Sequence, residues 1–267
     1  VSLTLHAGET LGLVGESGCG KSTLSNAIVG LVRPTRGSIR IKGAEVVGAT
    51  RKELDDIRRN AQMIFQDPAL SLNPRMTIGE TVGESLSVRN IARGKDLERR
   101  IGELLLAVGL RAEHAGRYPH QFSGGQRQRV VIARALALEP ALVVCDEPVS
   151  ALDVSVQAQI LNLFRDLREQ FGLSYLFVTH DLAVVRQVAD RVYVLHNGSV
   201  VEEGPTEQIL DRPGHEYTRR LIASIPRSDF SAACLPIRRS MAGRASASRY
   251  RPMASARSRY SAGCAAC

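Results

Sequence analysis

One run of residues in this chain has the spacing needed to bind a polyphosphate. Residues 15 to 22 read Gly-Glu-Ser-Gly-Cys-Gly-Lys-Ser, which fits the pattern G-x-x-x-x-G-K-[S/T], and they follow a short apolar run, Leu11 to Val14. The glycines let backbone N–H groups face phosphate oxygens, the next helix presents its positive end, and Lys21 adds a full charge. The Ser22 hydroxyl is a ligand for Mg²⁺. The pattern assigns nucleotide binding to Gly15, Glu16, Ser17, Gly18, Cys19, Gly20, Lys21, Ser22 and Thr23.

Two adjacent carboxylates follow another apolar run. Residues 141 to 145 predict a strand that is buried on both faces, and Asp146 and Glu147 stand at its end. The carboxyl end of such a strand lies beside the phosphate site, so Asp146 can hold Mg²⁺ through water and Glu147 can deprotonate an attacking water. The alternative is a pair of solvated loop acids, but uncompensated carboxylates after an apolar strand usually meet a cation.

A second group suited to anion binding lies between these two motifs. Ser123-Gly124-Gly125-Gln126 stands at a predicted helix start, with Ser123 as the N-cap. Two glycines at a helix N-terminus offer free N–H groups and a positive dipole end to an anion. The apolar residues of this helix that we expect to face inward are Val130, Ile132, Ala133 and Leu136.

Together these motifs resemble those of the ATP-hydrolysing subunits of ABC transporters. In that family the Ser-Gly-Gly-Gln signature closes over the γ-phosphate that the other subunit's phosphate loop holds. The resemblance implies ATP and Mg²⁺ as cofactors. Two phosphate-binding helix starts in one chain, about a hundred residues apart, indicate a head-to-tail dimer that shares two ATP molecules.

The remaining motifs of the family occur in the expected order. Gln66 follows the strand-like run 61 to 65 and matches the Q-loop, which contacts Mg²⁺ and water. Residues 150 to 153 match the D-loop, and Asp153 is also a candidate N-cap. His180 ends the predicted strand 174 to 179 and matches the switch histidine that contacts the γ-phosphate. A lone histidine is more often structural, but its place at a strand end favours this role. The resemblance implies Glu147, His180 and Gln66 as catalytic residues, and Ser22, Gln66 and Asp146 as metal ligands.

Helix and strand signals alternate along the chain, which predicts an α/β fold with a mainly parallel sheet. We expect a phosphate-loop (RecA-like) nucleotide-binding core, an inserted helical subdomain, and N-terminal antiparallel strands formed by Val1 to Leu5 and Thr10 to Val14. Helical spacing predicts one helix that ends at Gly109 and a long one over Val156 to Phe171, and Asn197-Gly198 predicts a hairpin.

The same signals divide the chain into five parts. Residues 227–267, the tail, have no helical or strand period, so we expect disorder there. We interpret the tail as a divergent or frame-shifted end of the chain. Its Cys264 and Cys267 keep a C-x-x-C spacing with only Cys234 near in sequence, which is fewer than the about four ligands of a zinc site. The parts are 1–66, the first part of the core; 67–138, the helical subdomain; 139–208, the second part of the core; 209–226, a C-terminal helical extension; and 227–267, the tail.

The net charge of +8 comes almost entirely from the tail. Residues 227 to 267 hold eight arginines and one acid, Asp229, whereas residues 1 to 226 hold 27 basic and 26 acidic side chains. The body therefore has no basic stripe, and with 4% aromatic residues and no Trp it has little for base stacking. This composition argues against nucleic acid as a partner.

The N-terminal region lacks several expected features. The sequence has no initiator Met, no secretory segment and no apolar span of about 20 residues, so we expect neither an integral nor an exported protein. Cys19 and Cys145 lie inside motifs and need no partner, which suits a reducing cytoplasm. The family stacks adenine on an aromatic residue upstream of Val1, so we expect weaker ATP affinity if the chain starts there.

Three short sequence stretches narrow the resemblance to the ATPase subunits of importers of dipeptides, oligopeptides or nickel. It rests on residues 65–75, 146–157 and the His-Glu-Tyr-Thr of 215–218, and it extends over residues 1 to about 226. It implies membrane permease subunits, a second ATPase subunit and, indirectly, a substrate-binding protein as partners, at the cytoplasmic face of the inner membrane. The alternatives are a soluble ABC-type ATPase acting on nucleic acid and a truncated, inactive transporter subunit.

Overall fold

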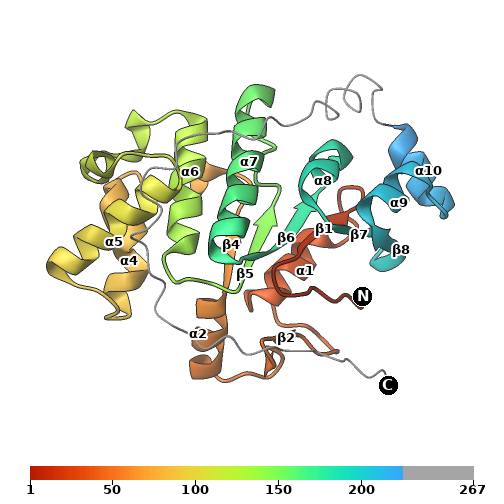
Figure 1. Cartoon of the computed structure of the whole chain (residues 1–267). Coiled ribbons are helices and arrows are strands. Elements are labelled where there is room, and N and C mark those ends of the chain that lie inside the picture. The colour runs from red at the N-terminus through yellow and green to blue at the C-terminus, as the bar shows by residue number, and fades with distance from the viewer. Residues whose placement is uncertain (225–267) are drawn as a thin grey trace. The chain divides into compact units, whose positions relative to one another are not determined.

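The computed structural model describes residues 1–224, and a six-stranded sheet organises this part of the chain (Figure 1). The strands lie in the order β4-β5-β6-β1-β7-β8. The first five strands are parallel, which confirms the prediction of a mainly parallel sheet. The sixth strand, β8, runs antiparallel to β7. Their bounds are β1 Thr10–Val14, β4 Ala61–Ile64, β5 Leu142–Asp146, β6 Ser174–Thr179, β7 Arg191–His196 and β8 Ser199–Pro205.

Helices cover both faces of the sheet. Along β5, Val143 and Cys145 join an apolar cluster with α4 to α7, whereas Val144 joins a cluster with α1 and α2. A strand buried on both faces therefore forms from a continuous apolar run rather than an alternating one. The helices are α1 Lys21–Ile28, α2 Arg51–Asn60, α3 Pro68–Ser71, α4 Ile78–Val88, α5 Gly94–Ala107, α6 Gly124–Leu136, α7 Val154–Phe171, α8 Leu182–Val188, α9 Thr206–Asp211 and α10 Glu216–Ala223, with 3₁₀ turns η1 Ala112–Gly116 and η2 Pro119–Gln121.

The segment between β4 and β5 is helical. α4, α5 and α6 pack on one another around Ile78, Leu105 and Val131, which are at most 1% exposed. α5 ends one residue before Val108, and Gly109 follows with φ +74°, the left-handed conformation that glycine adopts most easily after a helix. The predicted inserted helical segment is present, and within it α5 ends just before Gly109, as predicted.

The hairpin prediction at Asn197-Gly198 is also confirmed. These two residues join β7 to β8 with φ of +46° and +77°, as a two-residue hairpin turn requires. The long helix α7 buries Ile160, Phe164 and Leu167, which belong to the predicted apolar stripe.

The N-terminal pairing predicted from the sequence is wrong. Residues 1 to 5 form no strand, and β1 pairs in parallel with β6 on one side and with β7 on the other. Both edges of β1 are therefore occupied, so Thr10–Val14 has no free edge for a hairpin partner. The antiparallel pair in this part of the chain is a separate two-stranded sheet, β2 Arg40–Ile41 with β3 Ala44–Glu45.

The predicted disorder of residues 227–267 and the C-x-x-C spacing at Cys264 and Cys267 lie outside the described residues. None of the helices within residues 1–224 is long and apolar enough to cross a membrane.

Candidate functional site

Three neighbouring parallel strands bring the predicted site residues to one edge of the sheet. β5, β6 and β1 lie side by side, and each is followed directly by a predicted motif. Glu147 follows β5, His180 follows β6, and the phosphate loop from Gly15 to Gly20 follows β1. Carboxyl ends of parallel strands meet at one edge, which is where ligands bind in open α/β sheets.

The phosphate loop wraps around its own lysine. Lys21 Nζ donates to the carbonyl oxygens of Gly15 at 2.7 Å and Glu16 at 2.8 Å, and the residue is only 6% exposed. Gly20 has φ +106° and precedes α1 without a side-chain cap, so the first N–H groups of α1 have no side-chain acceptor there. A loop with a buried ammonium at an uncapped helix start suits phosphate oxygens.

The Ser22 hydroxyl of α1 meets the Asp146 carboxylate at the end of β5. Ser22 Oγ donates to Asp146 Oδ1 at 3.3 Å. Burial raises the pKa of Asp146 above its ordinary value and Glu147 adds to this rise, while the Ser22 hydroxyl and the Lys21 ammonium oppose it. A carboxylate whose charge is poorly compensated, beside a hydroxyl, is a hard-oxygen donor set of the kind Mg²⁺ prefers. Within residues 1–224 no group of three His, Cys, Asp or Glu side chains could hold a metal on its own.

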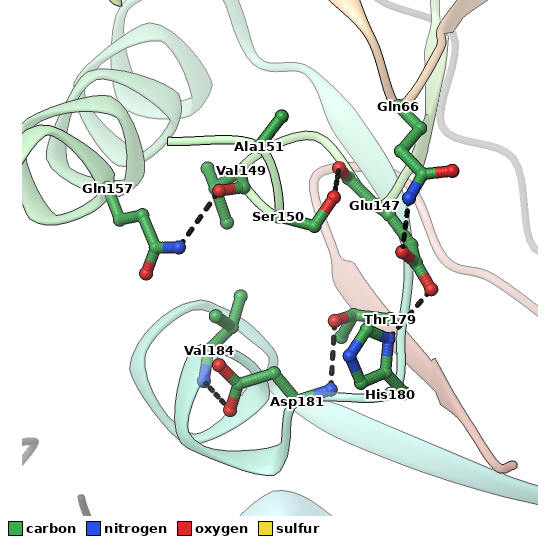
Figure 2. Close-up of a pocket in the computed structure, with 10 residues that line it drawn as sticks. All are labelled: Gln66, Glu147, Val149, Ser150, Ala151, Gln157, Thr179, His180, Asp181 and Val184. Carbon is green, nitrogen blue, oxygen red and sulfur yellow. Dashed lines mark hydrogen bonds and ion pairs between the residues drawn. The ribbon is translucent and has the colours of Figure 1, made fainter. Parts of the chain in front are cut away.

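The Glu147 carboxylate is held by two other predicted site residues (Figure 2). Gln66 Nε2 donates to Glu147 Oε2 at 3.0 Å, and His180 Nδ1 lies 2.8 Å from Oε1. Glu147 has a left-handed backbone with φ +49°, and its N–H donates to the carbonyl of Val178. Three residues that are far apart in the sequence thus form one hydrogen-bonded group.

A pocket of about 370 Å³ opens beside this group (Figure 2). Its lining contains the three predicted catalytic residues, Gln66, Glu147 and His180, together with residues of the D-loop and of the start of α8. Asp181 caps α8 by accepting the N–H of Ala183 at 2.8 Å, and thereby holds the turn after His180. The pocket is lined by Gln66, Glu147, Val149, Ser150, Ala151, Gln157, Thr179, His180, Asp181 and Val184.

The signature residues stand apart from this group. Ser123 caps α6 in a reciprocal capping box with Gln126, at 3.3 and 3.0 Å. Among residues 1–224 no hydrogen bond joins residues 123–126 to the phosphate loop, and α6 and α1 lie well apart in Figure 1. A Cβ on Gly125 would lie 2.5 Å from Cγ1 of Val156, so glycine permits close packing against α7.

Asp153 occupies the N-cap position of α7, as expected, but its side chain accepts no capping hydrogen bond. Its carbonyl instead accepts the N–H groups of Val156 and Gln157. The carboxylate is therefore not engaged in holding the start of α7.

Sequence reasoning missed Tyr217 on α10 as a neighbour of the phosphate loop. The Glu16 N–H donates to the Tyr217 hydroxyl at 3.0 Å, across 201 residues of sequence. Tyr217 belongs to the His-Glu-Tyr-Thr motif that contributes to the family resemblance, but no local sequence pattern connects this tyrosine to Glu16.

Comparison with known families decides which class of protein this is. Residues 1–150 match the ABC transporter family, and residues 201–265 match the family described as "Oligopeptide/dipeptide transporter, C-terminal region". The chain belongs to the ABC transporter ATPases. The second match extends to residue 265, beyond residue 226, where the motif resemblance ended.

Relatives of this ABC ATPase include subunits of peptide transport systems. Oligopeptide transport ATP-binding protein OppF of Bacillus subtilis is 49% identical over 86% of this chain and 76% of its own length. OppF of Escherichia coli is 51% identical over 86% of this chain and 69% of its own length. Glutathione import ATP-binding protein GsiA of Pectobacterium atrosepticum is 52% identical over 86% of this chain, which spans 37% of GsiA.

Solved structures agree with the ABC ATPase fold. The ATP-binding cassette MJ0796, solved as a dimer in a post-hydrolysis state with ADP and Pi, has a TM-score of 0.67 at 35% identity, over 76% of this chain and 88% of that one. CbiO1 of Clostridium perfringens, part of the ABC transporter complex cbiONQ, has a TM-score of 0.72 at 26% identity, over 87% and 90%. The predicted α/β core and the ATP-hydrolysing class are confirmed.

Proposed function

We propose that this ABC ATPase binds MgATP at its phosphate loop, hydrolyses it in a head-to-tail dimer, and thereby energises the import of short peptides. The observation that carries the proposal is the Glu147 carboxylate, fixed between Gln66 and His180 next to the loop that holds Lys21. A base, its positioning partners and a phosphate site on adjacent strand ends are the parts that phosphoryl transfer to water requires.

Each part of the phosphate site has a role in this proposal. The N–H groups of the phosphate loop and of the first turn of α1 would surround the phosphate oxygens, apart from the Glu16 N–H, which Tyr217 holds; Lys21 would leave its loop carbonyls to pair with the β- and γ-phosphates. Ser22, Asp146 and Gln66 would hold Mg²⁺, which neutralises charge on the phosphates when bound. The 3.3 Å contact between the Ser22 hydroxyl and the Asp146 carboxylate supports this assignment, because it brings two hard oxygen donors together at the phosphate loop.

Hydrolysis depends on Glu147 as the base. A water donates a proton to the Glu147 carboxylate as its oxygen attacks the γ-phosphorus; the bond to the β-γ bridging oxygen breaks, and ADP leaves with that oxygen. Gln66 and His180 orient the carboxylate, and His180 also contacts the γ-phosphate. General-base catalysis of this kind contributes roughly 10²- to 10⁴-fold in rate.

The second subunit completes the site. The start of α6 is exposed at Ser123 and Gly124 and half-buried at Gly125 and Gln126, and within residues 1–224 no hydrogen bond joins these residues to their own chain's phosphate loop. In a head-to-tail dimer these residues cover the ATP of the partner subunit. Asp153 lies at the same interface, and its carboxylate makes no capping hydrogen bond to α7. MJ0796, solved as a dimer, supports such an arrangement.

We propose short peptides rather than nickel as the cargo, because the relatives named above are peptide or glutathione transport proteins. The partners are then membrane permease subunits, a second ATPase subunit that is identical or homologous, and a substrate-binding protein that acts indirectly. The chain works at the cytoplasmic face of the inner membrane as a peripheral subunit. The nearly neutral charge of residues 1–226 gives no reason to expect nucleic acid as a partner of the ATPase body.

The test is chromosomal replacement by Lys21→Ala, followed by uptake of labelled di- and oligopeptides, glutathione and nickel by the cells. We expect loss of peptide uptake with nickel uptake unchanged. Loss of nickel uptake with peptide uptake intact would overturn the cargo proposal. In parallel, the purified chain should bind MgATP in a Lys21-dependent manner; the absence of such binding would overturn the ATP site itself.

A further inference from the structure

The phosphate loop packs against one stretch of the chain, residues 195 to 217, which contacts it at three places. A Cβ on Gly15 would lie 2.2 Å from the Leu195 carbonyl oxygen, so the loop passes directly against the end of β7. The Gly198 N–H donates to the Cys19 carbonyl at 3.1 Å. These two contacts involve backbone atoms of the β7-β8 hairpin and follow from the sheet itself.

The third contact comes from a side chain. The Tyr217 hydroxyl accepts the Glu16 N–H at 3.0 Å, and Tyr217 is 4% exposed. Among residues 1–224, no other side chain outside the motif hydrogen-bonds to residues 15–20. The Glu16 residue is held at both ends, since its carbonyl accepts both Lys21 Nζ and the N–H of Cys19. Tyr217 therefore fixes the residue whose carbonyl receives the phosphate-binding lysine.

Tyr217 is itself held in place. Its ring lies against the His196 ring at the end of β7, with centroids 3.9 Å apart and planes inclined by 32°. The turn before α10 is anchored to β8, because the Glu202 carboxylate accepts the N–H groups of Gly214 at 2.6 Å and His215 at 3.1 Å. His215 Nδ1 then accepts the Tyr217 N–H at 3.1 Å. Figure 1 shows α9 and α10 beside β7 and β8.

We propose that Tyr217 is a positioning residue of the ATP site, which sets the phosphate loop in its binding conformation through the Glu16 N–H. The inference rests on the proposed binding of ATP at this loop. It gives a function to part of the segment that matches the oligopeptide/dipeptide transporter C-terminal region: α10 belongs to the nucleotide site.

A purely structural role is the competing explanation. The Tyr217 ring also packs in an apolar cluster with Ile209 and Leu210. Tyr217→Phe separates the two roles, because it keeps the ring and removes only the hydroxyl. Tyr193→Phe is the matched control: Tyr193 is 3% exposed on β7, and its hydroxyl accepts a hydrogen bond of the same 3.0 Å length, from Arg191 rather than from the loop.

The experiment measures displacement of a fluorescent ATP analogue from the full chain by MgATP and, separately, by magnesium tripolyphosphate. Tripolyphosphate carries no base or ribose, so it reports on the phosphate loop alone. We expect Tyr217→Phe to weaken both competitors by the same factor, roughly two- to tenfold, which is the range for one hydrogen bond. The rate of hydrolysis at saturating ATP should stay unchanged, and Tyr193→Phe should bind both competitors like the parent.

Equal binding by Tyr217→Phe and the parent would overturn the inference and leave the proposed function standing. So would a loss that Tyr193→Phe reproduces, because it would reflect general loosening of the fold. A parent chain without Lys21-dependent binding would overturn the proposed function, and this inference with it.

Discussion

His180 and Glu147 follow two adjacent parallel strands, and their side chains meet with Nδ1 2.8 Å from Oε1. The histidine is more exposed than the carboxylate, with side-chain exposures of 56% and 17%. An exposed ring beside a mostly covered carboxylate leaves the imidazole free to reach a phosphate while it orients the base. Gln66 holds the other oxygen of the same carboxylate, so the base is fixed before any ligand binds.

Glu147→Gln should abolish ATP hydrolysis and retain ATP binding. The amide keeps the shape of the side chain but cannot take a proton from water, so the turnover number should fall by roughly 10²- to 10⁴-fold. Turnover and the equilibrium affinity for MgATP would be measured on the same preparation. Glu113→Gln is the control, because the Glu113 side chain is 79% exposed and forms a surface ion pair with Arg111. Hydrolysis by Glu147→Gln at the parent rate would contradict the assigned role.

The convergence of Asp146, Glu147 and His180 at one edge of the sheet was predictable because each stands at the end of a recognisable strand. Asp146, Glu147 and His180 end apolar runs, and the carboxyl-end rule for parallel strands places them at one edge without knowledge of the strand order. The predicted pairing of Val1–Leu5 with Thr10–Val14 was wrong because strand pairing, unlike a strand end, is not a local property of the sequence. Which strands flank β1 depends on β6 and β7, more than 150 residues away, and no local pattern encodes that choice.

Tyr217 illustrates the same limit within the site. Its contact with Glu16 depends on the path of β8, α9 and the turn anchored by Glu202, so it is a tertiary consequence. The N-cap prediction at Asp153 was right in position, but side-chain capping did not follow, because cap geometry depends on the rotamer as well as on the residue type.

Gly15→Ala should destabilise the protein and remove ATP binding. The added Cβ would lie 2.2 Å from the Leu195 carbonyl oxygen, a backbone atom of the sheet, and 2.8 Å from Cys19 Sγ. Overpacking of this kind costs about 1–3 kcal/mol or more. Urea denaturation would measure the loss. Gly116→Ala is the control, since a Cβ there meets no atom within 4 Å and the backbone is not left-handed. Equal stability of the two variants would refute the steric argument.

Glu45→Gln should destabilise the small β2-β3 sheet in a pH-dependent manner. The Ser38 hydroxyl lowers the pKa of Glu45 to about 2 against the effect of burial, with help from the N–H groups of Ile39 and Val47 and from Arg40. A carboxylate whose pKa is lower in the folded state stabilises the fold above its unfolded pKa, and this contribution is lost as the pH falls toward 2.

The expected stability loss for Glu45→Gln at pH 7 is below about 1 kcal/mol, because the carboxylate is partly exposed to screening solvent. Such a loss lowers Tm by at most about 2–4 °C. The gap between parent and variant should stay constant from pH 7 to about 5 and narrow below about 4.5, where the unfolded carboxyl takes up its proton. Thermal unfolding at stepped pH measures this, and a gap that widens in acid would reverse the assigned sign.

Two inactive variants should restore activity when they are mixed. Lys21→Ala destroys the phosphate loop and leaves the signature intact, whereas Ser123→Arg places a long side chain at the exposed start of α6 and leaves the loop intact. In a head-to-tail dimer, the mixed pair contains one composite site with an intact loop facing an intact signature. We therefore expect each variant alone to be inactive and the co-expressed mixture to hydrolyse ATP.

A mixture as inactive as its parts would mean that each chain serves its own ATP, or that this chain pairs only with a different subunit. Repeating the mixing with a homologous ATPase subunit that carries the Ser123→Arg equivalent separates these two explanations, because recovery there requires a shared site between unlike chains.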